Sequence, residues 1–152
     1  MPGMSTSMRR VWSDIILSAE REYLLRALGW SALSIVLGTT VVVVLAAKRI
    51  RSPLLSSFAT QTIAWGILIA LIAGASWQGL HLRDVGGAAR LERFLWMRIG
   101  LDVGCTAVGA TLMLAGRAAQ RRMHLIGVGV GVTVQGLALL LLDLQFAGLV
   151  SR

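Results

Sequence analysis

Residues 27–47 read ALGWSALSIVLGTTVVVVLAA, a run without a single charged side chain. A helix of about 20 such residues crosses the roughly 30 Å hydrocarbon core of a bilayer. Valines at 41–44 would favour a strand in water, but a spanning segment must pair its backbone groups internally, as helices and closed barrels do. We therefore predict a transmembrane helix over 27–47.

Three more stretches carry at most one charge each: 52–82, 99–116 and 123–151. They are too long for barrel strands, so we predict helices over 54–80, 93–116 and 124–149. Apolar residues make up 56% of the 152-residue chain and charged residues 14%, and mean hydropathy is +0.75. This composition excludes an ordinary soluble domain. The expected fold class is all-α, a four-transmembrane-helix bundle over 27–152.

Residues 1–26 are expected to form a separate amphipathic segment. Apolar residues recur there at helical spacing, and charged residues take most of the other positions. Such a segment lies along the membrane surface or extends the first span. Lys48, Arg49 and Arg51 directly follow the first apolar run, which indicates a retained span rather than a cleaved signal.

The distribution of basic residues predicts the orientation. One side carries nine of them, Arg9, Arg10, Arg21, Arg26, Arg83, Arg90, Arg93, Arg98 and Arg152, and the other side carries six, Lys48, Arg49, Arg51, Arg117, Arg121 and Arg122. Positive-inside counting favours both termini in the cytoplasm. The net charge of +8 suits anionic lipid headgroups, and we expect no nucleic-acid partner.

The chain contains a candidate internal duplication. When the sequence is shifted against itself so that Gly29 falls on Gly100, the same shift matches Gly38 with Gly109, Thr40 with Thr111, Arg51 with Arg122, and Tyr23 with Phe94. The second helices match only when this shift is one position shorter, which places Trp65-Gly66 on Gln135-Gly136. The alternatives are two tandem helical hairpins, related by a pseudo-twofold axis along the membrane normal, and a chance match of small residues.

Two carboxylates lie within the apolar runs. Asp102 follows the start of the third predicted helix by about nine residues, and Asp143 precedes the end of the fourth by about six. Both therefore lie about 9 to 14 Å inside the same membrane face, and Arg98 is one helical turn before Asp102. A charge within a span costs about 2.5 to 3.5 kcal/mol on insertion scales. We expect these three residues to form a cluster.

The cluster has two interpretations. An arginine between two carboxylates is a structural clasp that holds the second hairpin together, which is the interpretation we favour. A carboxylate with an incomplete set of partners could instead carry a proton or bind a cation or a polar headgroup. The completeness of the pairing decides between them.

Amide and indole groups make a second set of candidates. Gln61 and Trp65 share one face of the second predicted helix, and Gln135 continues a stripe of small residues on the fourth. Within membranes such amides most often hydrogen-bond to neighbouring helices, and binding a ligand is the alternative.

Several kinds of site are not expected. Cys105 is the only cysteine, which excludes an intrachain disulfide. His81 and His124 fall at opposite membrane faces, and no metal-binding spacing or phosphate-binding loop is present. We predict no catalytic residue and no metal site, and the cofactor is unknown.

Three segments contain the polar candidates: Leu101-Asp102-Val103-Gly104, the segment from Gln135-Gly136 to Asp143, and Gln61-Thr62-Ile63-Ala64-Trp65-Gly66. These motifs resemble those of an uncharacterised family of small four-helix bacterial membrane proteins. The resemblance covers most of residues 27–146, and Cys105 departs from the aromatic residue usual in that family. It implies the four-helix fold and these polar residues, and no biochemical function.

The expected function is that of a non-enzymatic structural or accessory membrane subunit. Glycine-rich helix faces would pack it into a homo-oligomer or against another membrane protein, among membrane lipids. The alternative is a protein that binds or transports a lipid-like small molecule or an ion through Asp102, Asp143, Gln61 and Gln135. A pocket between the second and fourth helices that contains non-protein density would favour the alternative, whereas a dry, filled interior would favour the subunit.

Overall fold

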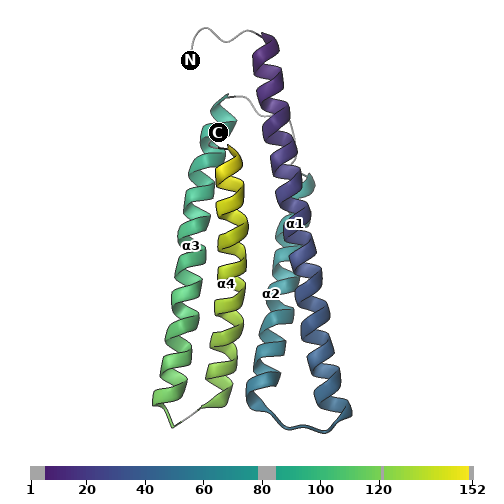
Figure 1. The fold of residues 1–152 in the computed structure, drawn as a ribbon, viewed down its shortest axis with the longest axis vertical. Coiled ribbons are helices and arrows are strands. Elements are labelled where there is room, and N and C mark those ends of the chain that lie inside the picture. The colour runs from purple at the N-terminus through teal and green to yellow at the C-terminus, as the bar shows by residue number, and fades with distance from the viewer. Residues whose placement is uncertain (1–5, 79–84, 121, 151–152) are drawn as a thin grey trace.

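Four helices make up the fold. The computed structural model describes residues 6–78, 85–120 and 122–150, and for 6–13, 16, 85–92 and 149–150 it describes the backbone only. The helices are α1 (Thr6–Ala47), α2 (Pro53–Gln78), α3 (Val85–Ala118) and α4 (Met123–Val150). They run up and down in turn, with the turn of each hairpin at the same end (Figure 1).

The all-α fold class is confirmed, since the described residues contain no strand. Each helix includes a segment long and apolar enough to cross a membrane. The helix bounds agree closely with the prediction, except that α1 begins at Thr6 rather than at residue 27, and α3 begins at Val85 rather than at residue 93. The expected end of the second helix at residue 80, together with His81, Arg83, Arg121 and Arg152, lies outside the described residues.

The segment before the first apolar run continues α1 without a break. α1 has 42 residues, a length of about 63 Å, which is roughly twice the hydrocarbon thickness. Its purple N-terminal end extends beyond the other helices in Figure 1. Of the two expected arrangements, the structure has the extension of the first span, and Tyr23 and Leu24 of that extension are buried.

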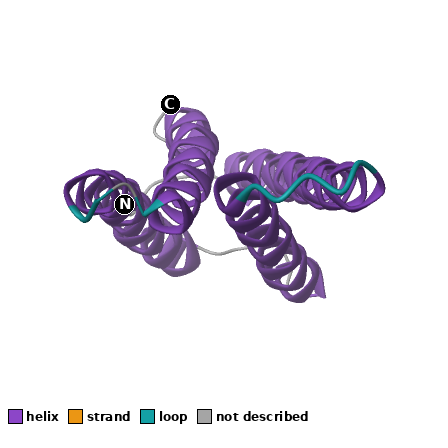
Figure 2. Ribbon diagram, turned by 90° about the horizontal axis from the view of Figure 1, so that it is seen from below, coloured by secondary structure: helices purple, strands orange, loops and turns teal. Residues whose placement is uncertain are grey.

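The helices pack as two hairpins. α1 packs along α2, and α3 packs along α4. α2 and α4 join the hairpins, with a smaller contact between α1 and α4. Figure 2 shows this arrangement end on. Within the described ranges, the backbone of α3 contacts α4 alone.

The two hairpins make equivalent close contacts. At each one the backbone of a glycine approaches the backbone of the facing helix, so that an added Cβ would overlap it or fit only tightly. The matched contacts are Gly38 with Ala59 and Ile63, Gly109 with Gly129 and Thr133, Gly66 with Ser31 and Ile35, and Gly136 with Asp102 and Thr106. In each matched pair, the residues of the first contact align with those of the second under the two sequence shifts described above. This agreement favours an internal duplication over a chance match.

The turns between the paired helices are also equivalent. Arg49 and Gln120, which the longer shift aligns, are the non-glycine residues with positive φ in the described chain, both at 53°. Each follows a helix end in the left-handed conformation that typically closes a helix. The first turn spans 48–52 and the second 119–122. The second turn is one residue shorter, which explains why the shift shortens by one between the helices of a hairpin.

Small residues also join the hairpins. An added Cβ on Gly127 would overlap the carbonyl oxygen of Leu54, and one on Gly131 would touch the side chain of Gln61. Toward the other end, a core of Tyr23, Leu24, Ala27, Ile69, Ala73, Leu95, Ile99 and Phe146 lies between the helices.

The symmetry between the two hairpins is incomplete, because α1 contacts α4 whereas α3 and α2 make no equivalent contact among the described residues.

The bundle is open rather than compact. It exposes 9929 Å² of surface, whereas a compact monomer of its mass of 16.3 kDa exposes about 7,500 Å². Much of this surface is apolar, as expected for helices that face lipid. Two features contribute to this large exposed surface. The N-terminal end of α1 projects beyond the other helices, and within the described ranges the backbone of α3 has a single neighbour.

Candidate functional site

The predicted cluster forms between α3 and α4. Asp143 of α4 is fully buried, and its Oδ2 lies 3.3 Å from Nε of Arg98 on α3. Asp102, 7% exposed, lies within interaction range of both Asp143 and Arg98. Helix spacing places Arg98 one turn from Asp102 on α3, and the packing of α4 against α3 adds Asp143 to the pair. The ion pair recorded for Arg98 is with Asp143, across the hairpin.

Tyr23 of α1 completes this cluster and was missed by the sequence analysis. Nη2 of Arg98 donates a hydrogen bond to Oη of Tyr23, and the guanidinium lies 5.1 Å from the centre of the tyrosine ring. Phe146 packs against the same ring, with centroids 5.0 Å apart. The sequence feature that could have indicated Tyr23 is the pattern of helical spacing, which continues through this residue into the first span.

The pairing within the cluster is incomplete. Two carboxylates face one guanidinium, so the fully ionised cluster carries one net negative charge. In the described part of the chain, no well-formed hydrogen bond is made to Oδ2 of Asp102 or to either oxygen of Asp143, although the hydroxyl of Tyr23 lies within interaction range of Asp143. The contact between Arg98 and Asp143 is thus an ion pair without good hydrogen-bond geometry. Buried carboxylates normally accept several hydrogen bonds, which makes this deficit the main feature of the site.

Gln135 lies in a separate polar network that is well satisfied. Its Oε1 accepts a hydrogen bond of 2.7 Å from Nε1 of Trp30, and its Nε2 donates one of 3.1 Å to Oγ of Ser34. Gln135 is 1% exposed and two turns of α4 away from Asp143. The network joins α4 to α1, which matches the structural interpretation of this amide.

Gln61 and Trp65 do not join the charged cluster. Both are half-buried on α2, and Gln61 packs against Gly131 where α2 meets α4. The six candidate residues therefore separate into the charged cluster of Arg98, Asp102 and Asp143, the network of Gln135, and the α2 positions Gln61 and Trp65.

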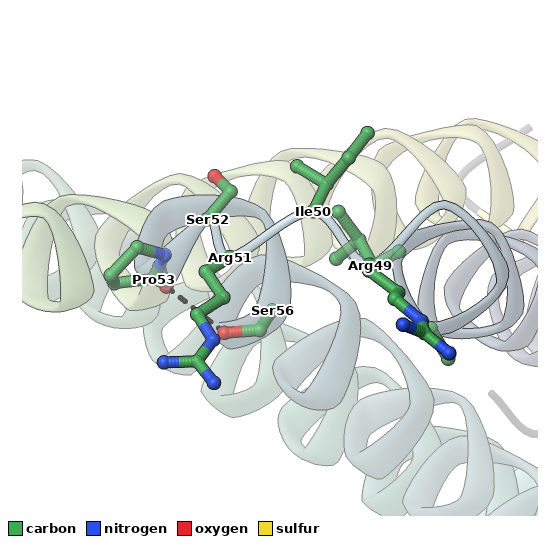
Figure 3. Close-up of a pocket in the computed structure, with 8 residues that line it drawn as sticks. Arg49, Ile50, Arg51, Ser52, Pro53 and Ser56 are labelled. Carbon is green, nitrogen blue, oxygen red and sulfur yellow. Dashed lines mark hydrogen bonds between the residues drawn. The ribbon is translucent and has the colours of Figure 1, made fainter.

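Two recesses in the described structure lie away from the cluster, near the connecting turns. One of about 650 Å³ is lined by the first turn, where Figure 3 shows Arg49 and Arg51 extending from the backbone. Another, of about 460 Å³, lies between the first turns of α2 and α4 and is lined by Ser56, Ser57, Thr60, Gln61, His124 and Val128. Both are open to the surface, so they lack the enclosure of a ligand pocket.

By helix length and composition, the chain has the form of a multi-pass helical membrane protein. It belongs to a family of unknown function (DUF6992), whose model matches residues 26–144. The matched range contains Arg98, Asp102 and Asp143, whereas Tyr23 precedes it. No curated protein matches the chain, and no solved structure matches it.

Proposed function

We propose that the protein is a non-enzymatic structural subunit of a membrane assembly built from copies of this chain. The observation that carries the proposal is the uncovered face of α3. Among the described residues this helix has one backbone neighbour, α4, and its opposite face carries a continuous row of small residues. The row, here called the α3 stripe, consists of Gly100, Gly104, Ala107, Thr111 and Ala115, all exposed.

The α3 stripe has the spacing of a helix–helix contact. Its members recur at intervals of three and four residues, which places them on one side of the helix over four turns. An added Cβ on Gly100 or Gly104 would meet nothing within 4 Å in the described structure. By contrast, the glycines on the α4 side, such as Gly109, already lie against a neighbouring backbone. Small residues at this spacing let two membrane helices approach closely.

A second copy of the chain is the occupant best suited to this face. The stripe is nearly neutral, so it offers no charge by which another partner would be selected, whereas two identical stripes related by a twofold axis fit each other. The same mode of close glycine packing already holds both hairpins together. The excess exposed surface of the open bundle is also consistent with assembly.

Cysteine crosslinking in membranes tests the proposal. Replacing the single cysteine by Cys105→Ser provides the background, into which Gly104→Cys is introduced. Mild oxidation should convert most of the Gly104→Cys protein into a disulfide-linked dimer. The control is Leu68→Cys on the exposed outer face of α2, which should stay monomeric. Equal dimer yields from both variants would contradict an interface on α3.

We further propose that the protein lies in a bacterial inner membrane with both termini in the cytoplasm. The excess of basic residues on the side of the termini supports this orientation. A reporter enzyme that is active only outside the cytoplasm should be inactive when it is fused to the C-terminus. An active reporter would contradict the proposed orientation.

Binding of an ion or a lipid-like molecule is the second candidate function. The incomplete pairing of Asp102 and Asp143 favours it. Gln135 contributes less than expected, because its amide is already engaged by Trp30 and Ser34. A role in binding therefore depends mainly on the charged cluster, and Gln61 could contribute only at the open recess that it lines between α2 and α4.

A further inference from the structure

We propose that the cluster of Arg98, Asp102 and Asp143 is a binding site for one exchangeable proton, shared between the two carboxyl groups. The site is distinct from the α3 stripe and does not depend on assembly. Both carboxylates are more than nine-tenths buried, and they lie within interaction range of each other. The bound proton forms an O–H bond on one carboxyl group, and the other carboxylate accepts the hydrogen bond.

Charge balance is the first argument. Arg98 neutralises one carboxylate, through the 3.3 Å ion pair with Asp143. The nearby guanidinium of Arg26 does not neutralise the other, because it pairs with Glu22 at 2.6 Å and donates to Gln145. A second ionised carboxylate in an apolar interior is costly. One proton brings the cluster to zero net charge.

The remaining groups at this level complete the surroundings of the site. Tyr23 faces the cluster from α1 and accepts a hydrogen bond from Arg98. Glu20, also buried, lies three residues before Tyr23 on the same helix. A test must therefore distinguish aspartate from glutamate.

The first hairpin is an internal control for the role of the cluster. At the positions equivalent to Arg98 and Asp143 it has Ala27 and Ala73, both buried in the core. It nevertheless makes the same glycine contacts and the same left-handed turn as the second hairpin. The hairpin architecture thus forms without any charge at these positions. The charged cluster is not required as a clasp for this packing, and a separate role accounts for it better.

The residue of the first hairpin that is equivalent to Asp102 is a hydrogen-bond donor. Ser31 occupies this position in the first hairpin, and its hydroxyl donates to the carbonyl oxygen of Gly66 at 2.9 Å. A protonated carboxyl group preserves a donor at this position, whereas a carboxylate can only accept. Oδ2 of Asp102 has no donor to accept from among the described residues. A proton between Asp102 and Asp143 removes that deficit.

A proton fits the site better than a metal cation. Metal cations such as Ca²⁺ take several oxygen ligands, and the described residues contain no group of three His, Cys, Asp or Glu side chains suited to a metal. The guanidinium of Arg98 also lies against Asp143, where it would repel a cation. A proton needs only the two carboxyl groups.

Infrared spectroscopy tests the proposal directly. The protein is labelled with aspartate carrying heavy carbon in its side-chain carboxyl group, and then reconstituted in lipid vesicles at neutral pH. The carbonyl stretch of a protonated aspartic acid should appear at an intensity of one group per chain. The band should shift in heavy water, because the proton exchanges. Glu20 is invisible to this label.

Variants assign the band. Asp102→Asn and Asp143→Asn should each abolish it, because the remaining carboxylate then pairs with Arg98 and ionises. Asp14→Asn, at an exposed position of α1, should leave it unchanged. Absence of the band from the wild-type protein would overturn the proposal whatever the variants do. Its persistence in either cluster variant would overturn the sharing of the proton.

Discussion

Gln135 shows how a single polar side chain can be accommodated between apolar helices. Its carbonyl and amide groups each have a partner on α1, at 2.7 Å and 3.1 Å. Asp143, two turns along the same helix, is equally buried, but among the described residues it has an ion pair without a well-formed hydrogen bond. A satisfied polar group stabilises a membrane bundle, whereas an unsatisfied one is costly. A functional role explains why such a costly group is retained.

The substitution Gln135→Leu should destabilise the bundle. It leaves the indole N–H of Trp30 without an acceptor and removes a bond to Ser34, with a cost of about 1–2 kcal/mol in the free energy of unfolding. Unfolding titrations in SDS would measure the change. The matched control is Gln78→Leu at the exposed end of α2. Equal stability of both variants would show that the network contributes nothing.

The sequence predicted part of the charged cluster and not the rest. Arg98 and Asp102 are one turn apart on one helix, and Asp143 lies at a matching depth on the next helix, so helix geometry alone joins them. Tyr23 and Ser34 were not predictable, because they reach the second hairpin from α1, at the far end of the chain. The period of an apolar helix does not show which face meets which neighbour.

The chain contains two copies of one helical hairpin, and the copies differ in the residues of their interiors. Equivalent glycines set the approach of the helices in both copies, and the left-handed residues Arg49 and Gln120 close the first helix of each hairpin. The helices themselves were predictable, because charge-poor runs of this length can satisfy their backbone only as helices. The continuity of α1 was left open, because an amphipathic segment suits a surface helix as well as an extension.

Gly127 should be sensitive to a single added methyl group. In Gly127→Ala the new Cβ would overlap the backbone of Leu54 where α2 meets α4, and overpacking of this kind costs about 1–3 kcal/mol. Gly74→Ala, with nothing within 4 Å among the described residues, should be neutral or stabilising, because alanine favours helices by up to about 1 kcal/mol over glycine. SDS-induced unfolding of the two variants would compare them. A less stable Gly74→Ala protein would contradict this assignment of the contacts.

At the scale of the whole molecule, the bundle exposes about a third more surface than a compact chain of its mass. Within the described residues, α2 and α4 provide most of the packing between the hairpins, and α3 lies at the edge with the small-residue stripe facing outward. This architecture leaves an approachable helix face for a second copy. The proposed proton site lies on the other side of α3, toward α4 and α1.

Native mass measurement of the protein in mild detergent or lipid nanodiscs tests whether the chain assembles through α3. We expect a species of twice the chain mass of 16.3 kDa, because a stripe on one face produces a closed twofold dimer. Gly104→Leu should shift the protein to single chains, since its bulk prevents close approach of the helices. A wild-type protein that has the mass of one chain, or that copurifies with a different polypeptide, would contradict the proposed assembly.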